Sequence, residues 1–97
     1  MPTQSSAVLL AELNALRIEV DVLDEQLVEL LARRFRITER IGAMKRELAL
    51  PPVDPDREAI QFANYRTLAV RHRLEPEMVA SLFRIIIDEV VVDHGRV

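Results

Sequence analysis

The sequence predicts an all-α fold of three helices, the first very long, in one domain over residues 1–97 that forms a homodimer. Three observations predict it. Apolar residues repeat at helical spacing from Leu9 to Leu48, no glycine or proline interrupts that repeat before Gly42, and two later segments each open near a proline. A chain of 97 residues is too short to divide into two domains.

The first helix is predicted over about residues 7 to 48 by a heptad pattern. Apolar residues fall at alternating steps of four and three, and charged residues lie off this line. We call this line the seam; it consists of Leu9, Leu13, Leu16, Val20, Leu23, Leu27, Leu30, Ile37, Ile41, Met44 and Leu48. Pro51 and Pro52 end the helix, because proline has no amide hydrogen and disfavours helical conformation in the residue before it.

This helix is too long for the rest of the chain to cover. About 42 residues form a rod of about 63 Å, whereas a compact domain of 100 residues has a radius of gyration of about 13 Å. The seam therefore requires a second chain, and a two-fold homodimer is the commonest arrangement that supplies one. We expect a homodimer in which both chains are available to build the active site.

Two shorter helices are predicted after the first. Asp54 suits the N-cap of the second helix and Pro55 its first position, and this helix runs to about His72. Its weak apolar stripe consists of Ile60, Ala63 and Leu68. The third helix opens at residues 74–76 and buries one face against the others. That face consists of Val79, Leu82, Phe83, Ile86 and Val90.

Composition excludes several classes of function. With no cysteine and only two histidines, the chain is not expected to bind a metal or to use a cysteine nucleophile. A net charge of −3 with 4% aromatic residues argues against a nucleic-acid partner. Neither a signal segment nor a membrane span is recognisable, so we expect a cytoplasmic protein with no membrane partner.

Arg34 is the position at which the seam is not apolar. Burial of a guanidinium without an anion costs several kcal/mol, so the seam here either holds an anion or opens to water. Lys45, the only lysine, lies eleven residues further on, which is about 20° past three full turns and hence over the same helix face. One interpretation is structural: Arg34 sets the dimer register and Lys45 is solvated. The other is a cationic pocket for a small molecule with carboxylates.

Six fragments in order resemble the all-helical chorismate mutases, over about residues 9 to 94. They are Leu-Arg at 16–17, Leu-Asp-Glu at 23–25, Leu-Leu-Ala-Arg-Arg at 30–34, Ile-Gly-x-x-Lys at 41–45, Val-Asp-Pro-Asp-Arg-Glu at 53–58 and Leu-Phe-Arg-Ile-Ile-Ile-Asp-Glu at 82–89. The resemblance implies an intertwined homodimer with two identical shared active sites and no cofactor. It also implies conversion of chorismate to prephenate, on the branch towards phenylalanine and tyrosine.

The resemblance further implies a role for each candidate site residue. Arg34 binds one carboxylate of the dicarboxylate substrate, and Arg17 of the partner subunit binds the second. Lys45 donates to the ether oxygen of the breaking bond. Glu58, helped by the backbone of Asp54, accepts a hydrogen bond from the ring hydroxyl.

Three more positions line the implied pocket. Arg57 closes over it. Val90 and His94 depart from the residue types of the family, which has a small hydroxyl residue and, four residues later, glutamine or glutamate. Val90 is then a wall residue. His94 either donates to the ether oxygen beside Lys45, as a tautomer or as a cation, or lies in solvent at the end of the chain.

The sequence is also compatible with other functions. Isochorismate pyruvate lyase and 4-amino-4-deoxychorismate mutase use a similar cationic pocket, although Glu58 suits the 4-hydroxyl of chorismate. An alternative of another class is a non-catalytic helical dimerisation module, in which Arg34 serves only the register. An activating partner enzyme is compatible with the resemblance, and the sequence does not identify one.

Overall fold

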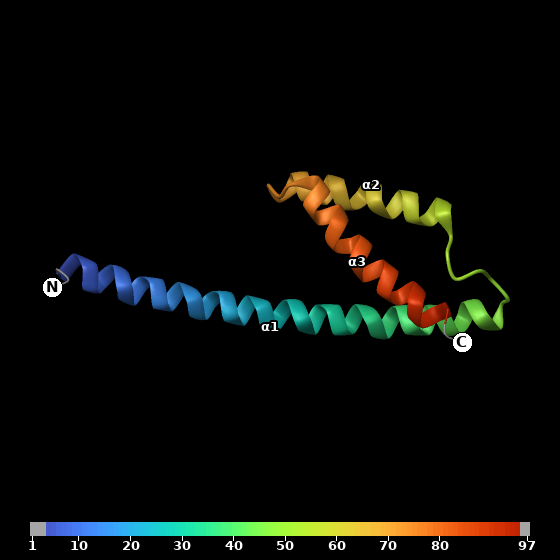
Figure 1. Ribbon diagram of the computed structural model, residues 1–97, viewed down its shortest axis with the longest axis horizontal. Helices are drawn as coiled ribbons and strands as arrows, with labels where there is room; N and C mark the ends of the chain where they lie inside the picture. The colour runs from blue at the N-terminus through green and yellow to red at the C-terminus, as the bar shows by residue number, and fades with distance from the viewer. Residues whose placement is uncertain (1–3, 96–97) are drawn as a thin grey trace. The chain divides into compact units, whose positions relative to one another are not determined.

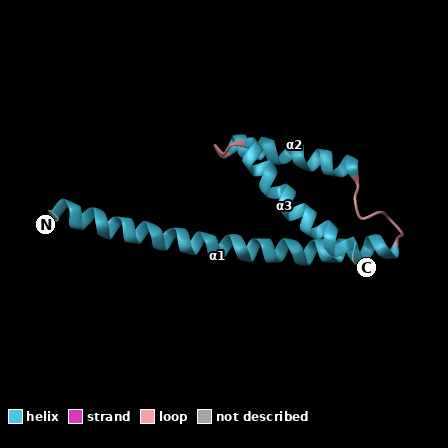
Figure 2. Ribbon diagram, viewed as in Figure 1, coloured by secondary structure: helices cyan, strands magenta, loops and turns pink. Residues whose placement is uncertain are grey.

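The computed structural model describes the backbone of residues 4–95 and the side chains of residues 5–90. This part of the chain folds into three α-helices joined by two loops and contains no strand (Figures 1 and 2). The helices are α1 (Gln4–Glu47), α2 (Pro55–Arg71) and α3 (Pro76–Gly95). The predicted all-α class and the very long first helix are thereby confirmed.

The contacts within the chain divide it into two compact units, with the boundary after Phe35. In the first unit, α1 exposes the apolar side chains of the seam, with exposed fractions between 42% for Leu13 and 64% for Leu27. A contiguous apolar row of this kind marks an interaction surface in a soluble protein. A seam that pairs with a second chain is expected to be exposed in the single chain, as it is here. The homodimer itself stays a prediction.

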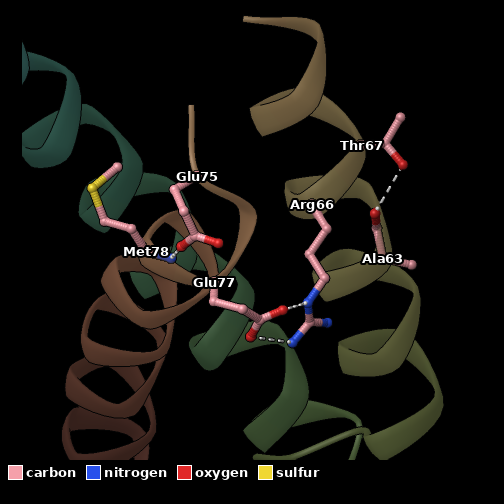
Figure 3. A network of polar contacts seen from close by, with 6 residues as sticks. All are labelled: Ala63, Arg66, Thr67, Glu75, Glu77 and Met78. Carbon is pink, nitrogen blue, oxygen red and sulfur yellow. Dashed lines mark hydrogen bonds and ion pairs between the residues drawn. The ribbon is translucent and has the colours of Figure 1, made fainter. Parts of the chain in front are cut away.

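Capping side chains start both α2 and α3, and the sequence predicted the first of these two caps. The carboxylate of Asp54 accepts a hydrogen bond from the amide of Arg57 at 3.2 Å, and Pro55 occupies the first turn of α2. At the start of α3, the carboxylate of Glu75 accepts from the amide of Met78 at 2.7 Å (Figure 3). Each cap satisfies an amide that has no partner within its own helix.

The helices α1 and α2 both end in a Schellman motif that is built on a residue other than glycine. After α1, Ala49 adopts a φ of 56° and the amide of Leu50 donates to the carbonyl of Lys45 at 2.8 Å. After α2, Arg73 occupies the same position with a φ of 59°. This left-handed conformation favours glycine, so both turns carry some backbone strain.

The second unit contains a small aromatic core between α2 and α3. The ring of Tyr65 stacks on that of Phe83 with centroids 3.8 Å apart, and Phe62 meets Tyr65 edge to face at 5.3 Å. Phe62, Ala69 and Ala80 are the buried hydrophobic residues of the described part of the chain, each with at most 8% of its surface exposed. Small alanines on both helices allow the two backbones to approach where the aromatic rings do not fill the space.

The predicted apolar faces of α2 and α3 differ in their burial. The weak apolar stripe predicted on α2 is exposed within this chain, since Ile60 and Leu68 are 58% and 43% exposed and Ala63 is also exposed. The buried face of α2 lies on the other side and is aromatic, and aromatic rings bury more apolar area than aliphatic side chains do. On α3, Leu82 is exposed; the remaining predicted residues are half-buried, namely Val79, Phe83, Ile86 and Val90.

Candidate functional site

The side chain of Lys45 is held against the backbone of the loop between α1 and α2. Lys45 lies in the last turn of α1 and is half-buried. Its Nζ donates a hydrogen bond to the carbonyl oxygen of Pro52 at 3.1 Å. An ammonium group has three donors, so this bond leaves two for a ligand.

The first turn of α2 carries three more of the predicted site residues. The side chain of Asp54 is used by the helix cap, and its carbonyl oxygen accepts from the amide of Glu58 at 3.0 Å. Arg57 is exposed, whereas Glu58 is half-buried. The loop therefore brings Lys45 and the start of α2 into one region of the second unit.

Glu58 is paired with an arginine from α3. Nη1 of Arg84 donates to Oε1 of Glu58 at 2.5 Å and, more weakly, to Asp88 at 3.4 Å. The guanidinium lies over the ring of Phe62, with its central carbon 4.3 Å from the ring centroid. The hydrogen bond to Glu58 is the main cause that raises the pKa of Arg84 above its ordinary value. Arg84 is therefore a cation at neutral pH, as arginine side chains in proteins are.

A groove of about 500 Å³ lies between α2 and α3. The ring of Phe62 contributes to its apolar lining, and the ion pair of Glu58 with Arg84 lines it as well. A second ion pair, between Arg66 and Glu77 at 2.9 Å, also lines the groove (Figure 3). Of the predicted site residues, the described lining includes Glu58.

Arg17 and Arg34 lie on α1 in the first unit, apart from one another. Arg17 is exposed and Arg34 is half-buried. Arg34 lies seventeen positions after Arg17, which corresponds to about 25 Å along the helix axis. Seventeen positions also turn the helix by about 260° past four full turns, so the two arginines leave this helix in different directions.

The remaining predicted residues lie on α3. Val90 lies in the last part of α3 and is half-buried. His94 belongs to the helix, but its side chain lies outside the described residues. Within the described part of the chain, no group of three histidine or acidic side chains is placed to hold a metal ion. None of the described helices is long and apolar enough to cross a membrane.

Sequence reasoning assigned no role to Arg84, although it belongs to one of the fragments that carry the resemblance. Arg84 and Glu58 are 26 residues apart and come from different helices. The signal in the sequence is the spacing of Arg84 and Asp88 at i and i+4, which predicts an ion pair on one helix but does not point to Glu58.

Residues 16–93 match the family model for chorismate mutase type II. The chain belongs to the chorismate mutase type II family. The family match covers about four fifths of the chain and includes all the predicted site residues except His94. The predicted resemblance is thereby confirmed.

Named relatives of this family are similar to the chain at moderate identity. The chorismate mutase of Methanocaldococcus jannaschii is 25% identical over 80 residues, which are 82% of this chain and 81% of the relative. The 4-amino-4-deoxychorismate mutase of Streptomyces pristinaespiralis is 33% identical over 88 residues, covering 91% of this chain and 68% of the relative. The T-protein of Enterobacter agglomerans is 33% identical over 81 residues, which are 84% of this chain. The chain spans about a fifth of the length of that T-protein, since the match covers 22% of it.

Proposed function

We propose that the chain is a chorismate mutase, which rearranges chorismate to prephenate at a site shared by two copies of the chain. The observation that carries the proposal is the position of Lys45, half-buried and bonded to Pro52 beside the start of α2. This hydrogen bond holds the only lysine at Pro52, a few positions before Asp54 and Glu58. All of these residues lie within the family match, which spans residues 16–93.

The reaction needs no nucleophile, because one C–O bond breaks and one C–C bond forms within a single molecule. Catalysis then comes from holding the enolpyruvyl arm over the ring and from stabilising negative charge on the ether oxygen. Arg34 binds one carboxylate and Arg17 of the partner subunit binds the other. Lys45 donates to the ether oxygen, and a preorganised donor of this kind contributes roughly 3 to 4 kcal/mol.

The ring hydroxyl binds at the start of α2 in this proposal. Glu58 accepts its hydrogen bond, the backbone of Asp54 assists, and Arg57 closes over the substrate. Val90 forms a wall of the pocket, and His94 is a second donor to the ether oxygen. The half-buried position of Glu58 supports its part, since a carboxylate that is partly shielded from water forms stronger hydrogen bonds.

Two copies of the chain complete the site. The exposed seam and the separation of about 25 Å between Arg17 and Arg34 on one helix both favour a homodimer whose chains exchange arginines. We further infer that the protein works in the cytoplasm, where it needs no metal or other cofactor.

Incubation of the purified chain with three substrates, followed by product identification, tests the proposal. Prephenate formed from chorismate, faster than any product of isochorismate or 4-amino-4-deoxychorismate, supports it. Release of pyruvate from isochorismate identifies a lyase instead, and preferential rearrangement of the amino compound identifies a 4-amino-4-deoxychorismate mutase. A stable dimer that converts none of them and tolerates Arg34→Leu is a dimerisation module.

A further inference from the structure

We propose that Arg84 is a positioning residue that acts through Glu58 and selects a substrate with a ring hydroxyl over one with a ring ammonium group. The proposal rests on the proposed function, in which Glu58 receives the substituent at ring position 4. In this proposal Arg84 contacts Glu58, which binds the substrate, and does not contact the substrate itself.

The contacts of Arg84 fix it beside one oxygen of Glu58. Nη1 of Arg84 donates to Oε1, and the ring of Phe62 lies against the guanidinium at 4.3 Å. No described side chain donates to the other oxygen, Oε2. The pair therefore leaves Oε2 as the acceptor for a substrate group and holds the carboxylate in one orientation.

The charge of this pair favours a neutral donor. A guanidinium within hydrogen-bonding distance offsets most of the negative charge of the carboxylate. A hydroxyl still donates an ordinary hydrogen bond to Oε2, but an ammonium group bound there lies close to a second cation. Like charges brought together in this way lower affinity and provide specificity against the wrong ligand.

Asp88 weakens this effect only slightly. Its contact with Arg84 is 3.4 Å long and its side chain is 62% exposed, whereas the side chain of Glu58 is 22% exposed. Water screens the more exposed pair more strongly. The positive charge of Arg84 is therefore shared mainly with Glu58.

The two candidate substrates differ in this group. As its name states, 4-amino-4-deoxychorismate carries an amino group in place of the 4-hydroxyl of chorismate. An aliphatic amine is protonated at neutral pH. A relative named for the amino compound is 33% identical to this chain, so discrimination between the two groups is a property that separates similar proteins.

The ion pair of Arg66 with Glu77 provides a matched control. It also joins α2 to α3 and lines the same groove, with a distance of 2.9 Å (Figure 3). It does not involve Glu58. Loss of Arg66 therefore removes an interhelical ion pair without changing the charge beside the binding carboxylate.

The test measures kcat and KM for both substrates at neutral pH, with circular dichroism and the dimer content of each protein as checks on folding. In Arg84→Gln we expect the ratio of kcat/KM for chorismate to that for the amino compound to fall by about tenfold or more. Arg84→Lys restores the positive charge and should keep the ratio within about twofold of wild type, as should Arg66→Gln. Arg84→Met keeps an apolar stem against Phe62 and replaces Arg84→Gln if the latter does not fold.

Each outcome decides between the two proposals. If the wild-type chain converts chorismate and a folded neutral variant of Arg84 keeps the wild-type ratio, the role of Arg84 is overturned and the proposed function stands. An equal fall of the ratio in Arg66→Gln also overturns it, because general packing then explains the effect. If the wild-type chain converts neither substrate, the proposed function fails and the role of Arg84 fails with it.

Discussion

Lys45 and Pro52 are joined by a hydrogen bond of 3.1 Å from the ammonium nitrogen to the carbonyl oxygen, across the loop between α1 and α2. The bond links the last turn of the long helix to a residue two positions before the Asp54 cap. It limits the rotamers of the lysine before any substrate binds. A donor that is held in place needs little reorganisation when charge develops on the substrate.

Lys45→Ala should lower kcat by about 10²–10³-fold and leave a folded dimer, because the substitution removes the donor to the ether oxygen. The measurement is the rate of chorismate loss at saturating substrate. Arg46→Ala is the control, since Arg46 is an exposed cation one position further along the same helix. A wild-type kcat in purified Lys45→Ala would show that the lysine has no part in bond breaking.

Asp54→Ala should lower the free energy of unfolding by about 1 kcal/mol, because the amide of Arg57 loses its side-chain acceptor. Urea denaturation followed by circular dichroism measures the loss. Asp54→Asn keeps an acceptor oxygen and should retain most of the stability. Asp56→Ala removes an acid from the same turn without removing the cap, so a loss as large as that of Asp54→Ala would argue against the cap as the cause.

Ala49→Gly should raise the free energy of unfolding by about 0.5 to 1 kcal/mol, because glycine adopts the left-handed conformation at φ 56° without strain. Ala43→Gly is the matched change inside α1, and there we expect a loss of about 1 kcal/mol from helix propensity. Opposite signs in the two denaturation curves identify the turn as the origin of the gain. A loss in both variants would mean that Ala49 is not strained in solution.

Local patterns in the sequence predicted the helices, but the sequence did not predict the contacts between residues that are far apart along the chain. The seam, the Asp54 cap and the prolines each act within a few residues, so the bounds of α1 and α2 followed from them. The pair of Glu58 with Arg84 depends on how α2 crosses α3, which no spacing within one helix specifies. The same holds for the stack of Tyr65 on Phe83, and for this reason the sequence did not predict the aromatic face that α2 buries against α3.

The part of the proposed site that two chains share could not be derived from the sequence for a different reason. Arg17 and Arg34 stood out in the sequence through the resemblance and, for Arg34, through the break in the seam. In the proposed function their joint action depends on a second chain, and the pattern of one chain predicts such a partner without fixing its register. Lys45 was easier to place, since the helix end brings it to Pro52 only seven residues away.

Leu23→Lys should dissociate the homodimer, because it places a charge on the seam where the leucine side chain is 57% exposed in the single chain. Sedimentation equilibrium over a range of concentrations measures the dissociation constant. Glu19→Lys introduces the same side chain off the seam and should leave the dimer intact. An unchanged dissociation constant in Leu23→Lys would exclude the seam as the interface.

Mixing two inactive variants tests whether the site is shared. Arg17→Ala and Lys45→Ala should each be nearly inactive as homodimers, because every site in them lacks one essential cation. In a heterodimer of the two, the proposed arrangement places both losses in one site. The other site combines Lys45 of one chain with Arg17 of its partner, and both of these are intact.

Subunit exchange by co-refolding of equal amounts should therefore restore activity. Random pairing makes half of the dimers heterodimers with one working site each, so about a quarter of the wild-type activity is expected. Mixing without refolding is the control and should give none if the dimers do not exchange. If each site were built within one chain, every site in the mixture would lack either Arg17 or Lys45, and refolding would restore nothing. The recovered fraction thus reports directly whether the arginine crosses between the chains.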